Sequence, residues 1–257
     1  MYENILVERE EPLAFITFHR PEVRNAMNRK TKEEVLAALG ELEEDEGVRV
    51  VILRGSEEAF VAGADIKEFA DVRPMDQWED RREQGFYEAI PSFPKPVIAM
   101  IRGYCLGGGC ELILGCDLRI ASTTAKIGQP EINLGLIPGG GGSQRLPRLV
   151  GEGKAMQLIL SGEPISGEEA KAIGLVEEVY PDAEVEERTR EMALKIAEKS
   201  PIALRIAKEA IRAASKMGLT AGLEYESALF ALLFSTEDKA EGVKAFLEKR
   251  KASFKGR

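Results

Sequence analysis

The sequence lacks several features on which common classes of protein depend. Lysine and arginine (35) are outnumbered by aspartate and glutamate (44), so the formal net charge is −9. A nucleic-acid surface needs clustered basic side chains to neutralise phosphates, and the acidic balance argues against such a partner. No run approaches the ~20 apolar residues that a membrane-spanning helix requires. Residues 1–11 have neither the basic start nor the apolar core of a secretory signal, so we expect a cytoplasmic protein without a membrane partner.

Histidine and cysteine are also scarce, with one and three copies. Cys105, Cys110 and Cys116 form neither a CxxC pair nor a zinc-binding pattern. They stand among apolar residues, so we interpret them as buried, reduced thiols. A Ser-His or Cys-His catalytic system would have to use His19, and the Gly-x-Ser-x-Gly elbow of many hydrolases is missing. We expect His19 to be structural and the protein to hold no metal.

What is present is an ordinary globular composition, 44% hydrophobic and 31% charged, with alternating strand and helix patterns. Apolar runs predict strands over Leu13–Phe18, 48–53, 96–101, 118–121 and 175–180. An apolar stripe at helical spacing predicts a helix over 27–44, with Thr31 and Glu34 at the spacing of a capping box. This alternation indicates an α/β fold.

Helix signals dominate toward the C-terminus. Ser166 and Glu169 have the spacing of another capping box. Ser200 and Pro201 form an N-cap and first-turn pair. The last helix is predicted over 237–254, with apolar residues on one side and a basic end.

The most informative stretch is 106–111, where three consecutive glycines separate a strand-like run from a helix-like one. Glycine lets the backbone approach a ligand closely because it has no Cβ, and a helix that starts here aims free N–H groups at that ligand. Such groups suit an anionic oxygen that forms only during reaction. A second small-residue loop, 59–68, follows the predicted strand 48–53, and Ala64 and Gly108 are the candidate pair of donors. Taken alone, the second loop is better explained as a tight turn.

Two glutamates follow these turns. Glu111 stands just inside the predicted helix, and Glu131 comes twenty residues later, after a Gly-Gln-Pro turn. Singly, each is adequately explained as a member of an exposed ion pair. Two partly desolvated carboxylates close together repel, however, and this raises the pKa of one of them. One can then act as an acid while the other acts as a base.

A third glycine cluster lies at 139–142. It lacks the Gly-Lys-Ser/Thr ending of a phosphate-binding loop, and the triplet at 107–109 lacks the third glycine of a dinucleotide site. Nucleotide binding is therefore disfavoured. We expect Gly139 to help shape a polar pocket beside Glu131.

Together, these motifs resemble the enoyl-CoA hydratase (crotonase) family. The residues that carry the resemblance are AGADIKE at 62–68, PVIA at 96–99, GYCLGGGCEL at 103–112 and GQPEINLGLIPGGGGSQRL at 128–146. The similarity begins at His19 and continues to the C-terminal segment. It implies a crotonase-type spiral of repeated ββα units over 1–195, with a CoA-thioester site, and a C-terminal α-helical trimerisation region over 196–257. It also implies a homo-oligomer, a trimer or a dimer of trimers (a hexamer).

The resemblance assigns roles to particular residues. The N–H groups of Ala64 and Gly108 would hold the thioester carbonyl as an oxyanion hole, and Glu111 and Glu131 match the two catalytic glutamates of the hydratases. Where some relatives have a basic residue this chain has Glu22, so the phosphate contact is expected to fall to Arg24. The other expected substrate and CoA contacts are Ala62, Asp65, Ile66, Lys67, Gly139, Phe230 and Lys249.

The implied activity is that of a hydro-lyase, an enoyl-CoA hydratase that adds water to a trans-2-enoyl-CoA to give a 3-hydroxyacyl-CoA, with fatty-acid β-oxidation as the expected pathway. No metal or redox cofactor is expected, because CoA arrives as part of the substrate. The alternatives are a Δ3,Δ2-enoyl-CoA isomerase, which needs one carboxylate, and a hydratase or hydrolase of a branched or functionalised acyl-CoA, selected by acyl-pocket residues within 71–90. A non-enzymatic RNA-binding or scaffolding relative is disfavoured by the acidic balance and the complete glutamate pair.

Overall fold

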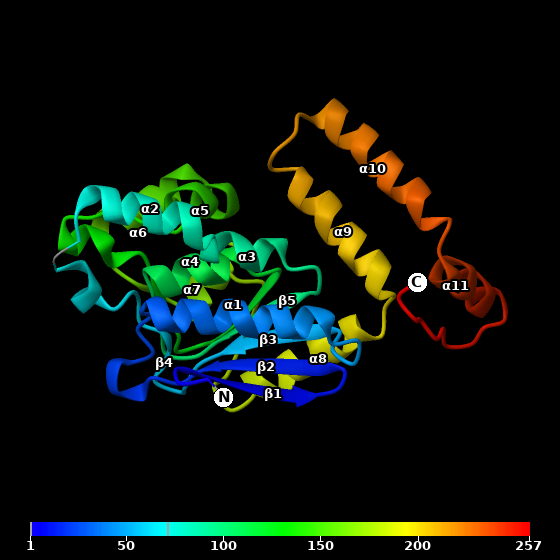
Figure 1. The fold of residues 1–257 in the computed structure, drawn as a ribbon, viewed down its shortest axis with the longest axis horizontal. Helices are drawn as coiled ribbons and strands as arrows, with labels where there is room; N and C mark the ends of the chain where they lie inside the picture. Colours follow the sequence, from blue (N-terminus) through cyan, green and yellow to red (C-terminus); the bar gives the residue numbers. More distant parts are fainter. Residues whose placement is uncertain (1, 71) are drawn as a thin grey trace.

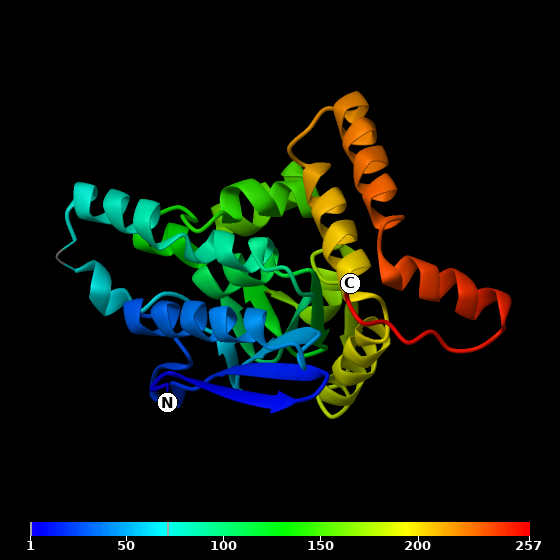
Figure 2. The same ribbon diagram turned by 45° about the vertical axis from the view of Figure 1, so that its right-hand side comes forward.

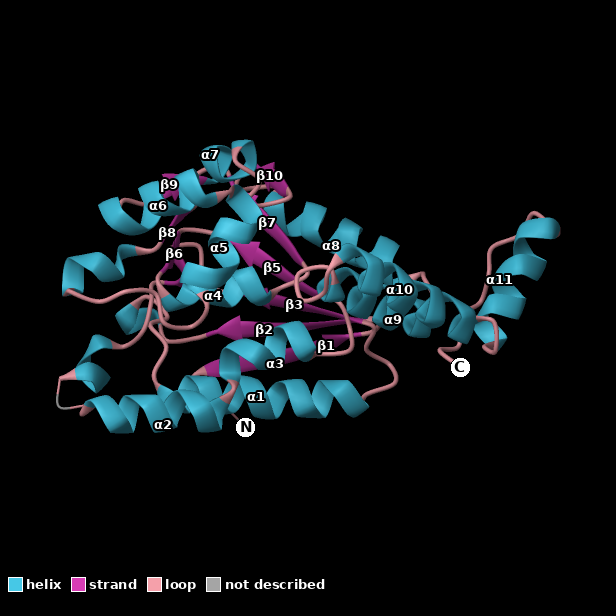
Figure 3. Cartoon of the chain, turned by 90° about the horizontal axis from the view of Figure 1, so that it is seen from above, coloured by secondary structure: helices cyan, strands magenta, loops and turns pink. Residues whose placement is uncertain are grey.

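The computed structural model of the chain describes residues 2–70 and 72–257, without the side chains of 80–84, and places the strands in two sheets. The larger sheet has the order β1-β2-β3-β5-β7-β10 and the smaller one the order β4-β6-β8-β9 (Figures 1 and 3). The strands are β1 (Ile5–Glu10), β2 (Leu13–Phe18), β3 (Val50–Arg54), β4 (Ala59–Val61), β5 (Val97–Ile101), β6 (Tyr104–Leu106), β7 (Leu118–Ser122), β8 (Lys126–Gly128), β9 (Ile165–Ser166) and β10 (Glu178–Tyr180).

The middle of the chain repeats a pattern of two strands followed by one or more helices. From β3 to β8, each pair of strands contributes one member to the larger sheet and the next to the smaller one. The helices are α1 (Arg29–Glu44), α2 (Pro74–Gln84), α3 (Phe86–Ser92), α4 (Gly108–Gly115), α5 (Gly142–Val150), α6 (Glu152–Ser161), α7 (Gly167–Ala172), α8 (Val185–Ala197), α9 (Pro201–Ala213), α10 (Leu219–Leu233) and α11 (Glu237–Leu247). This repetition is the predicted strand–strand–helix spiral of an α/β fold.

The central strands of the larger sheet are buried on both faces. Strands β2, β3, β5 and β7 are parallel neighbours, and such strands carry nearly continuous apolar runs. Along β3, Val50 and Ile52 join the core cluster that packs with α8, while Val51 and Leu53 join the cluster on the other face. The predicted strand 48–53 therefore exists with slightly shifted bounds.

Helix α1 begins differently from the sequence prediction. Its N-cap is Asn28, whose side chain accepts a hydrogen bond from the Thr31 N–H. The predicted capping box of Thr31 and Glu34 is therefore wrong, because Thr31 already lies in the first turn. The Glu34 carboxylate instead accepts N–H groups of Glu3 and Asn4 from the N-terminal segment. Asn28 thus provides the local cap, and Glu34 makes a tertiary contact instead.

The other two N-terminal signals are confirmed. Ser166 and Glu169 form the reciprocal capping box of α7. The Ser200 hydroxyl accepts the Ala203 N–H at the start of α9, with Pro201 in the first turn. Both caps depend only on residues within one turn of each other, which is why the sequence suffices to find them.

The last three helices extend away from the sheets, and both views show them at one side of the molecule (Figures 1 and 2). The helix predicted over 237–254 is too long, because α11 ends at Leu247 and Lys249 adopts a positive φ of 55°. The strand predicted over 175–180 is too long as well, since only Glu178–Tyr180 pairs with β7. Residue 195, the predicted end of the core, lies in the last turn of α8.

Two further observations concern the whole described chain. All three cysteines are free and buried, as predicted. Burial raises the pKa of the Cys116 thiol to about 12, so this group is inert near neutral pH. Over residues 2–70 and 72–257, none of the helices combines the length and apolar character needed to cross a membrane.

Candidate active site

Three parallel strands of the smaller sheet bring the predicted site residues to one edge. Val61 of β4 lies opposite Cys105 of β6, and Leu106 lies opposite Gly128 of β8. The residues that follow each strand, at 62–64, 107–111 and 129–131, therefore start side by side. The sequence analysis placed the second loop after the strand 48–53, but the strand that delivers it is β4. That strand is only three residues long, too short to give a periodic signal.

The turn between β6 and α4 requires glycine. Gly107 has φ 51° and ψ −120°, and it precedes α4 without any side-chain cap. A side chain is disfavoured at this φ, and a Cβ would also lie 3.3 Å from the Glu131 carboxylate. Within the described residues, the N–H of Gly108 donates no hydrogen bond to the protein. The start of α4 thus presents a free N–H where the glycine triplet predicted one.

The second predicted donor, Ala64, faces the same point. Ala64 forms a parallel bridge with Met27, in which the N–H of Met27 donates to Gly63 (2.8 Å) and the N–H of Asp65 donates to Met27 (2.9 Å). This pattern directs the N–H of Ala64 away from Met27. The Ala64 nitrogen lies 3.7 Å from the position that a Cβ on Gly108 would occupy. The Ala64 nitrogen therefore lies close to Gly108, as the predicted pair of oxyanion donors requires.

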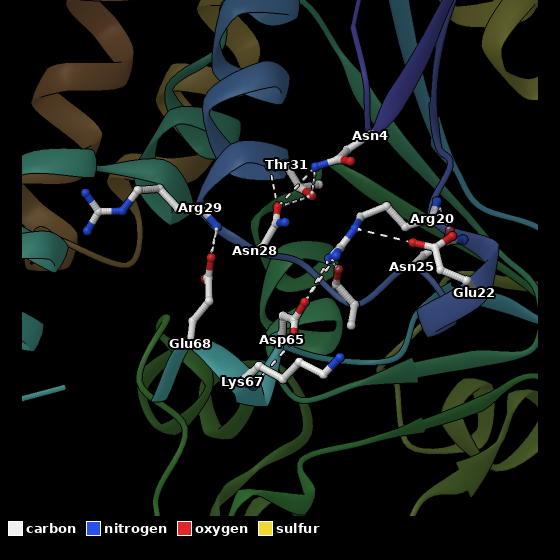
Figure 4. A network of polar contacts seen from close by, with 11 residues as sticks. Asn4, Arg20, Glu22, Asn25, Asn28, Arg29, Thr31, Asp65, Lys67 and Glu68 are labelled. Carbon is white, nitrogen blue, oxygen red and sulfur yellow. Dashed lines mark hydrogen bonds and ion pairs between the residues drawn. The ribbon is translucent and has the colours of Figure 1, made fainter. Parts of the chain in front are cut away.

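A polar network holds the Ala64 loop in place (Figure 4). The Arg20 guanidinium donates to the Asp65 carboxylate at 3.1 and 3.2 Å and to the carbonyl of Ala26 at 2.5 Å. The Glu68 carboxylate accepts the Arg29 N–H at 3.0 and 3.1 Å, which ties the loop to the first turn of α1. The sequence analysis missed Arg20, because its partner Asp65 is 45 residues away.

Glu111 lies in the first turn of α4 and is only 4% exposed. One of its carboxylate oxygens accepts the N–H of Gly140 at 2.5 Å and the N–H of Gly142 at 2.9 Å. Hydrogen bonds from N–H donors favour the ionised form of a carboxylate. The third glycine cluster therefore supports Glu111, whereas the sequence analysis expected it beside Glu131. Gly139 itself is exposed.

Glu131 lies in the short 3₁₀ helix η3 (Pro130–Leu134) and is partly buried. Desolvation raises its pKa from 4.5 to about 7, and repulsion by Glu111 adds to this rise. Gln129 is fully buried, and its amide nitrogen, turned toward Glu131, lies 2.8 and 3.1 Å from the two carboxylate oxygens. The two glutamates thus differ in environment, which is the condition for acid and base roles.

Tyr87 of α3 forms one wall of this site, and the sequence analysis did not single it out. A Cβ built on Gly108 would lie 2.7 Å from the Tyr87 hydroxyl, and one built on Gly140 would lie 2.5 Å from the ring. The ring therefore spans the distance between the oxyanion turn and the loop that supports Glu111. Tyr87 belongs to the stretch 71–90 that was expected to select the acyl group; residue 71 and the side chains of 80–84 lie outside the described residues.

The residues expected to contact CoA fall into two groups. Arg24 lies beside the Ala64 loop, because its carbonyl accepts the N–H of Ala62 at 3.1 Å. Its side chain pairs with Glu58 at 2.7 Å and stacks 5.3 Å from the centre of the Tyr104 ring. Asp65, Ile66 and Lys67 belong to the same segment, where Asp65 also accepts the Lys67 N–H and caps the 3₁₀ helix η2 (Ile66–Phe69).

Phe230 and Lys249 form the second group and lie elsewhere. Phe230 is on α10, 63% exposed, and stacks edge-to-face on Phe234 at 5.2 Å. Lys249 follows α11. Both views show α10 and α11 directed away from α4 (Figures 1 and 2), so one chain does not bring these residues to its own glutamates.

The fold and the site together define a class of protein, an α/β enzyme built for acid–base chemistry beside a carbonyl oxygen. The Ala64 nitrogen lies close to Gly108, the Glu131 carboxylate lies close to Gly107, and the two glutamates differ in environment. Across the described part of the chain, no group of three or more His, Cys, Asp or Glu side chains is placed to hold a metal ion.

The chain belongs to the enoyl-CoA hydratase/isomerase family, which its residues 8–257 match. It is 46% identical over 256 residues to a probable enoyl-CoA hydratase of Rhizobium meliloti, covering 100% of this chain and 99% of the relative. A crotonyl-CoA hydratase of Syntrophomonas wolfei is 42% identical, with 98% of both chains covered. The crystal structure of an enoyl-CoA hydratase from Bacillus anthracis superposes with a TM-score of 0.94 at 42% identity, covering 99% of this chain and 100% of that one. The predicted family and crotonase-type fold are confirmed.

Proposed function

We propose that the protein is an enoyl-CoA hydratase, a hydro-lyase that reversibly adds water to a trans-2-enoyl-CoA and yields a 3-hydroxyacyl-CoA. The observation that carries the proposal is that Glu111, which accepts two backbone N–H groups, lies near Glu131, whose pKa desolvation raises to about 7. Relatives that are named as enoyl-CoA, crotonyl-CoA and short-chain-enoyl-CoA hydratases support it. Fatty-acid β-oxidation is the pathway that this reaction serves most directly.

In the proposed reaction, the thioester oxygen lies between the N–H groups of Ala64 and Gly108. As the nucleophile adds to Cβ, negative charge moves onto this oxygen and the two fixed dipoles stabilise it. Removal of one such donor in other enzymes typically costs on the order of 10²–10³ in kcat. The pair of donors therefore accounts for a large part of the expected rate.

The two glutamates share one proton in the active form. Ionised Glu111, held by its two N–H donors, takes a proton from water while the oxygen forms the new bond to Cβ. Protonated Glu131, whose pKa is raised to about 7, gives its proton to Cα as the double-bond electrons return. One water is consumed, and proton exchange with solvent restores the starting state.

CoA enters as part of the substrate, and no separate cofactor is required by these steps. The segment from Ala62 to Lys67 and the neighbouring Arg24 are the proposed CoA contacts within one chain. Arg24 is paired with Glu58, so binding of a CoA phosphate there would exchange one anionic partner for another. Gly139, on the exposed loop beside the site, is proposed to border the acyl group.

We propose that residues 1–195 hold the catalytic site and that the protein works in the cytoplasm. Residues 196–257 are proposed to mediate assembly into a trimer or a dimer of trimers. Large apolar side chains are exposed on the C-terminal helices, including Ile211, Leu219, Leu223, Phe230, Phe246 and Leu247. Such a patch is expected to be covered by a partner. In an assembly, Phe230 and Lys249 would reach the CoA site of another copy. Light scattering of Phe246→Asp should show a smaller particle, whereas Leu6→Asp, an exposed control on β1, should not.

The activity is tested with crotonyl-CoA, by loss of enoyl absorbance and identification of the product. Wild type should form 3-hydroxybutyryl-CoA, and Glu111→Gln and Glu131→Gln should each lower kcat by roughly 10²–10⁴ while keeping the wild-type circular dichroism. Conversion of a 3-enoyl-CoA to the 2-enoyl isomer without hydration would instead establish the isomerase alternative. Wild-type rates in both variants would overturn the mechanism.

A further inference from the structure

The side chain of Arg145, on α5, joins two segments that form the walls of the proposed site. One guanidinium nitrogen donates to the carbonyl of Gly140 at 3.0 Å. The other donates to the carbonyl of Tyr87 at 3.1 Å and to the Glu88 carboxylate at 2.5 Å. The side chain is only 20% exposed. Arg145 thus fixes the glycine loop at 140–142 against α3.

The backbone at Gly141 is shaped to accept this guanidinium. Gly141 has φ 112°, and a Cβ there would lie 2.2 Å from a nitrogen of Arg145. The guanidinium therefore packs directly on the α-carbon of Gly141. The residues on either side, Gly140 and Gly142, are the two that donate their N–H groups to Glu111. Arg145 therefore contacts the loop at Gly141, between the two residues whose N–H groups hold the Glu111 carboxylate.

We propose that Arg145 is a positioning residue that sets the two N–H donors on Glu111, an inference that rests on the proposed hydratase activity. Arg145 does not touch the reacting atoms; it acts through the loop. Without the hydrogen bonds of Arg145, the N–H groups of Gly140 and Gly142 can move. A displacement near 1 Å can cost about 10² in rate. The ionised form of Glu111 also loses stabilisation. The acid limb of the pH–activity profile should therefore move to higher pH.

The pH dependence of activity is set by titratable groups near Glu111. The titratable groups near Glu111 include Glu131 of η3, the neighbouring thiol of Cys110 and the Tyr87 phenol, which the shared neighbour Gly140 places beside it. Tyrosine and buried thiols do not ionise near pH 6, so the acid limb reports the two carboxylates as a coupled pair.

The test compares Arg145→Lys and Arg145→Gln with Glu88→Gln. The control removes only the exposed ion-pair partner, since the Glu88 side chain is 72% exposed. Both Arg145 variants should lower kcat for crotonyl-CoA by about 10–10² with little change in KM, and should move the acid limb of kcat/KM upward by about one pH unit. Glu88→Gln should stay within about twofold of wild type. Hydrogen exchange should be faster at the Gly140 and Gly142 amides in both Arg145 variants.

Arg145→Lys keeps the charge and most of the volume, so it remains informative where Arg145→Gln fails to fold. A wild-type acid limb and wild-type amide exchange in the folded variants would overturn the inference. A wild type that hydrates no enoyl-CoA would overturn the proposed function instead, and the exchange rates of Gly140 and Gly142 would still decide whether Arg145 holds the loop.

Discussion

With its amide oriented so that the nitrogen faces Glu131, Gln129 donates to the two carboxylate oxygens of Glu131 at 2.8 and 3.1 Å. Gln129 is fully buried, and in this orientation its amide oxygen takes the position that lies 2.6 Å from a Cβ built on Gly142. Gln129 therefore separates Glu131 from the loop that donates to Glu111. Glu111 is held by the loop at 140–142 and Glu131 by Gln129, and this loop and Gln129 are in contact.

The activity should depend on pH through the pair Glu111 and Glu131. The active form holds one proton on the glutamate pair, so kcat/KM should follow a bell-shaped curve. The alkaline limb should lie near pH 7, because burial raises the pKa of Glu131 to about 7. Hydration and dehydration should show the same limbs, because the overall reaction neither takes up nor releases a net proton. The measurement is kcat/KM from pH 5 to 9 in both directions; a flat profile across pH 7 would refute the assignment of Glu131 as the acid.

Replacing Gln129 should shift that alkaline limb. The amide donates to the ionised carboxylate and favours it, so Gln129→Met should raise the pKa of Glu131 and move the limb to higher pH. We expect kcat to fall about tenfold as well, because Glu131 loses its orienting partner. Gln157→Met, at an exposed position on α6, is the matched control. An unshifted limb in a folded Gln129→Met protein would show that the contact has no electrostatic role.

The oxyanion site can be tested by filling it. A Cβ on Gly108 would lie 3.7 Å from the Ala64 nitrogen and 2.7 Å from the Tyr87 hydroxyl, the far end of a side chain that can move. Gly108→Ala should therefore fold but lower kcat/KM by about 10² or more, because the added methyl occupies the place of the thioester oxygen. Gly153→Ala, on α6 with no atom within 4 Å of the added methyl, should retain full activity. Full activity in Gly108→Ala would show that Gly108 is not part of the oxyanion site.

Local signals explain which parts of the molecule the sequence predicts. The glycine triplet and Glu111 stand within one turn of each other, so the start of α4 is readable from residue types alone. The caps at Ser166 and Ser200 are local in the same way. The apolar runs of the larger sheet are equally clear, since a strand buried on both faces has little polar content.

The missed features depend on contacts that are distant in sequence. The donors to Glu111 come from 29 and 31 residues away, and Arg145 reaches Tyr87 across 58 residues. No spacing rule identifies such partners. The error at α1 has the same origin, because the Glu34 carboxylate is engaged by the N-terminal segment rather than by its own helix.

Glu131 should also destabilise the folded protein at alkaline pH. Its pKa is raised from 4.5 to about 7 on folding, so its contribution to stability is fully present below pH 4.5 and is lost as the pH rises through 7. Glu131→Gln should therefore be more stable than wild type at pH 8 by about 1–3 kcal/mol and nearly equal at pH 4. Thermal unfolding at both pH values measures this, with Glu163→Gln at an exposed position as the control. Equal differences at pH 4 and pH 8 would contradict it.

Asp238 should be the main anchor of the C-terminal tail. Its carboxylate is 3% exposed and accepts the Ser200 hydroxyl at 2.6 Å and the N–H groups of Lys255 and Gly256 at 2.7 and 2.9 Å. Asp238→Ala leaves one buried and two partly buried donors without this acceptor, so we expect a loss of about 2–4 kcal/mol in the free energy of unfolding at fixed protein concentration. Urea titration measures this loss.

The released tail should also become accessible to trypsin at Lys251 and Lys255. Asp182→Ala is the matched control, because its exposed carboxylate accepts a single side-chain bond, from Thr124 at 2.7 Å, and it should cost less than about 1 kcal/mol. Asp238→Asn keeps one acceptor oxygen and should fall between the two. If Asp238→Ala unfolds at the wild-type urea concentration and its tail resists trypsin, the tail is held by other contacts, of which the bond from the Arg49 guanidinium to the carbonyl of Phe254 at 2.8 Å is the first to test.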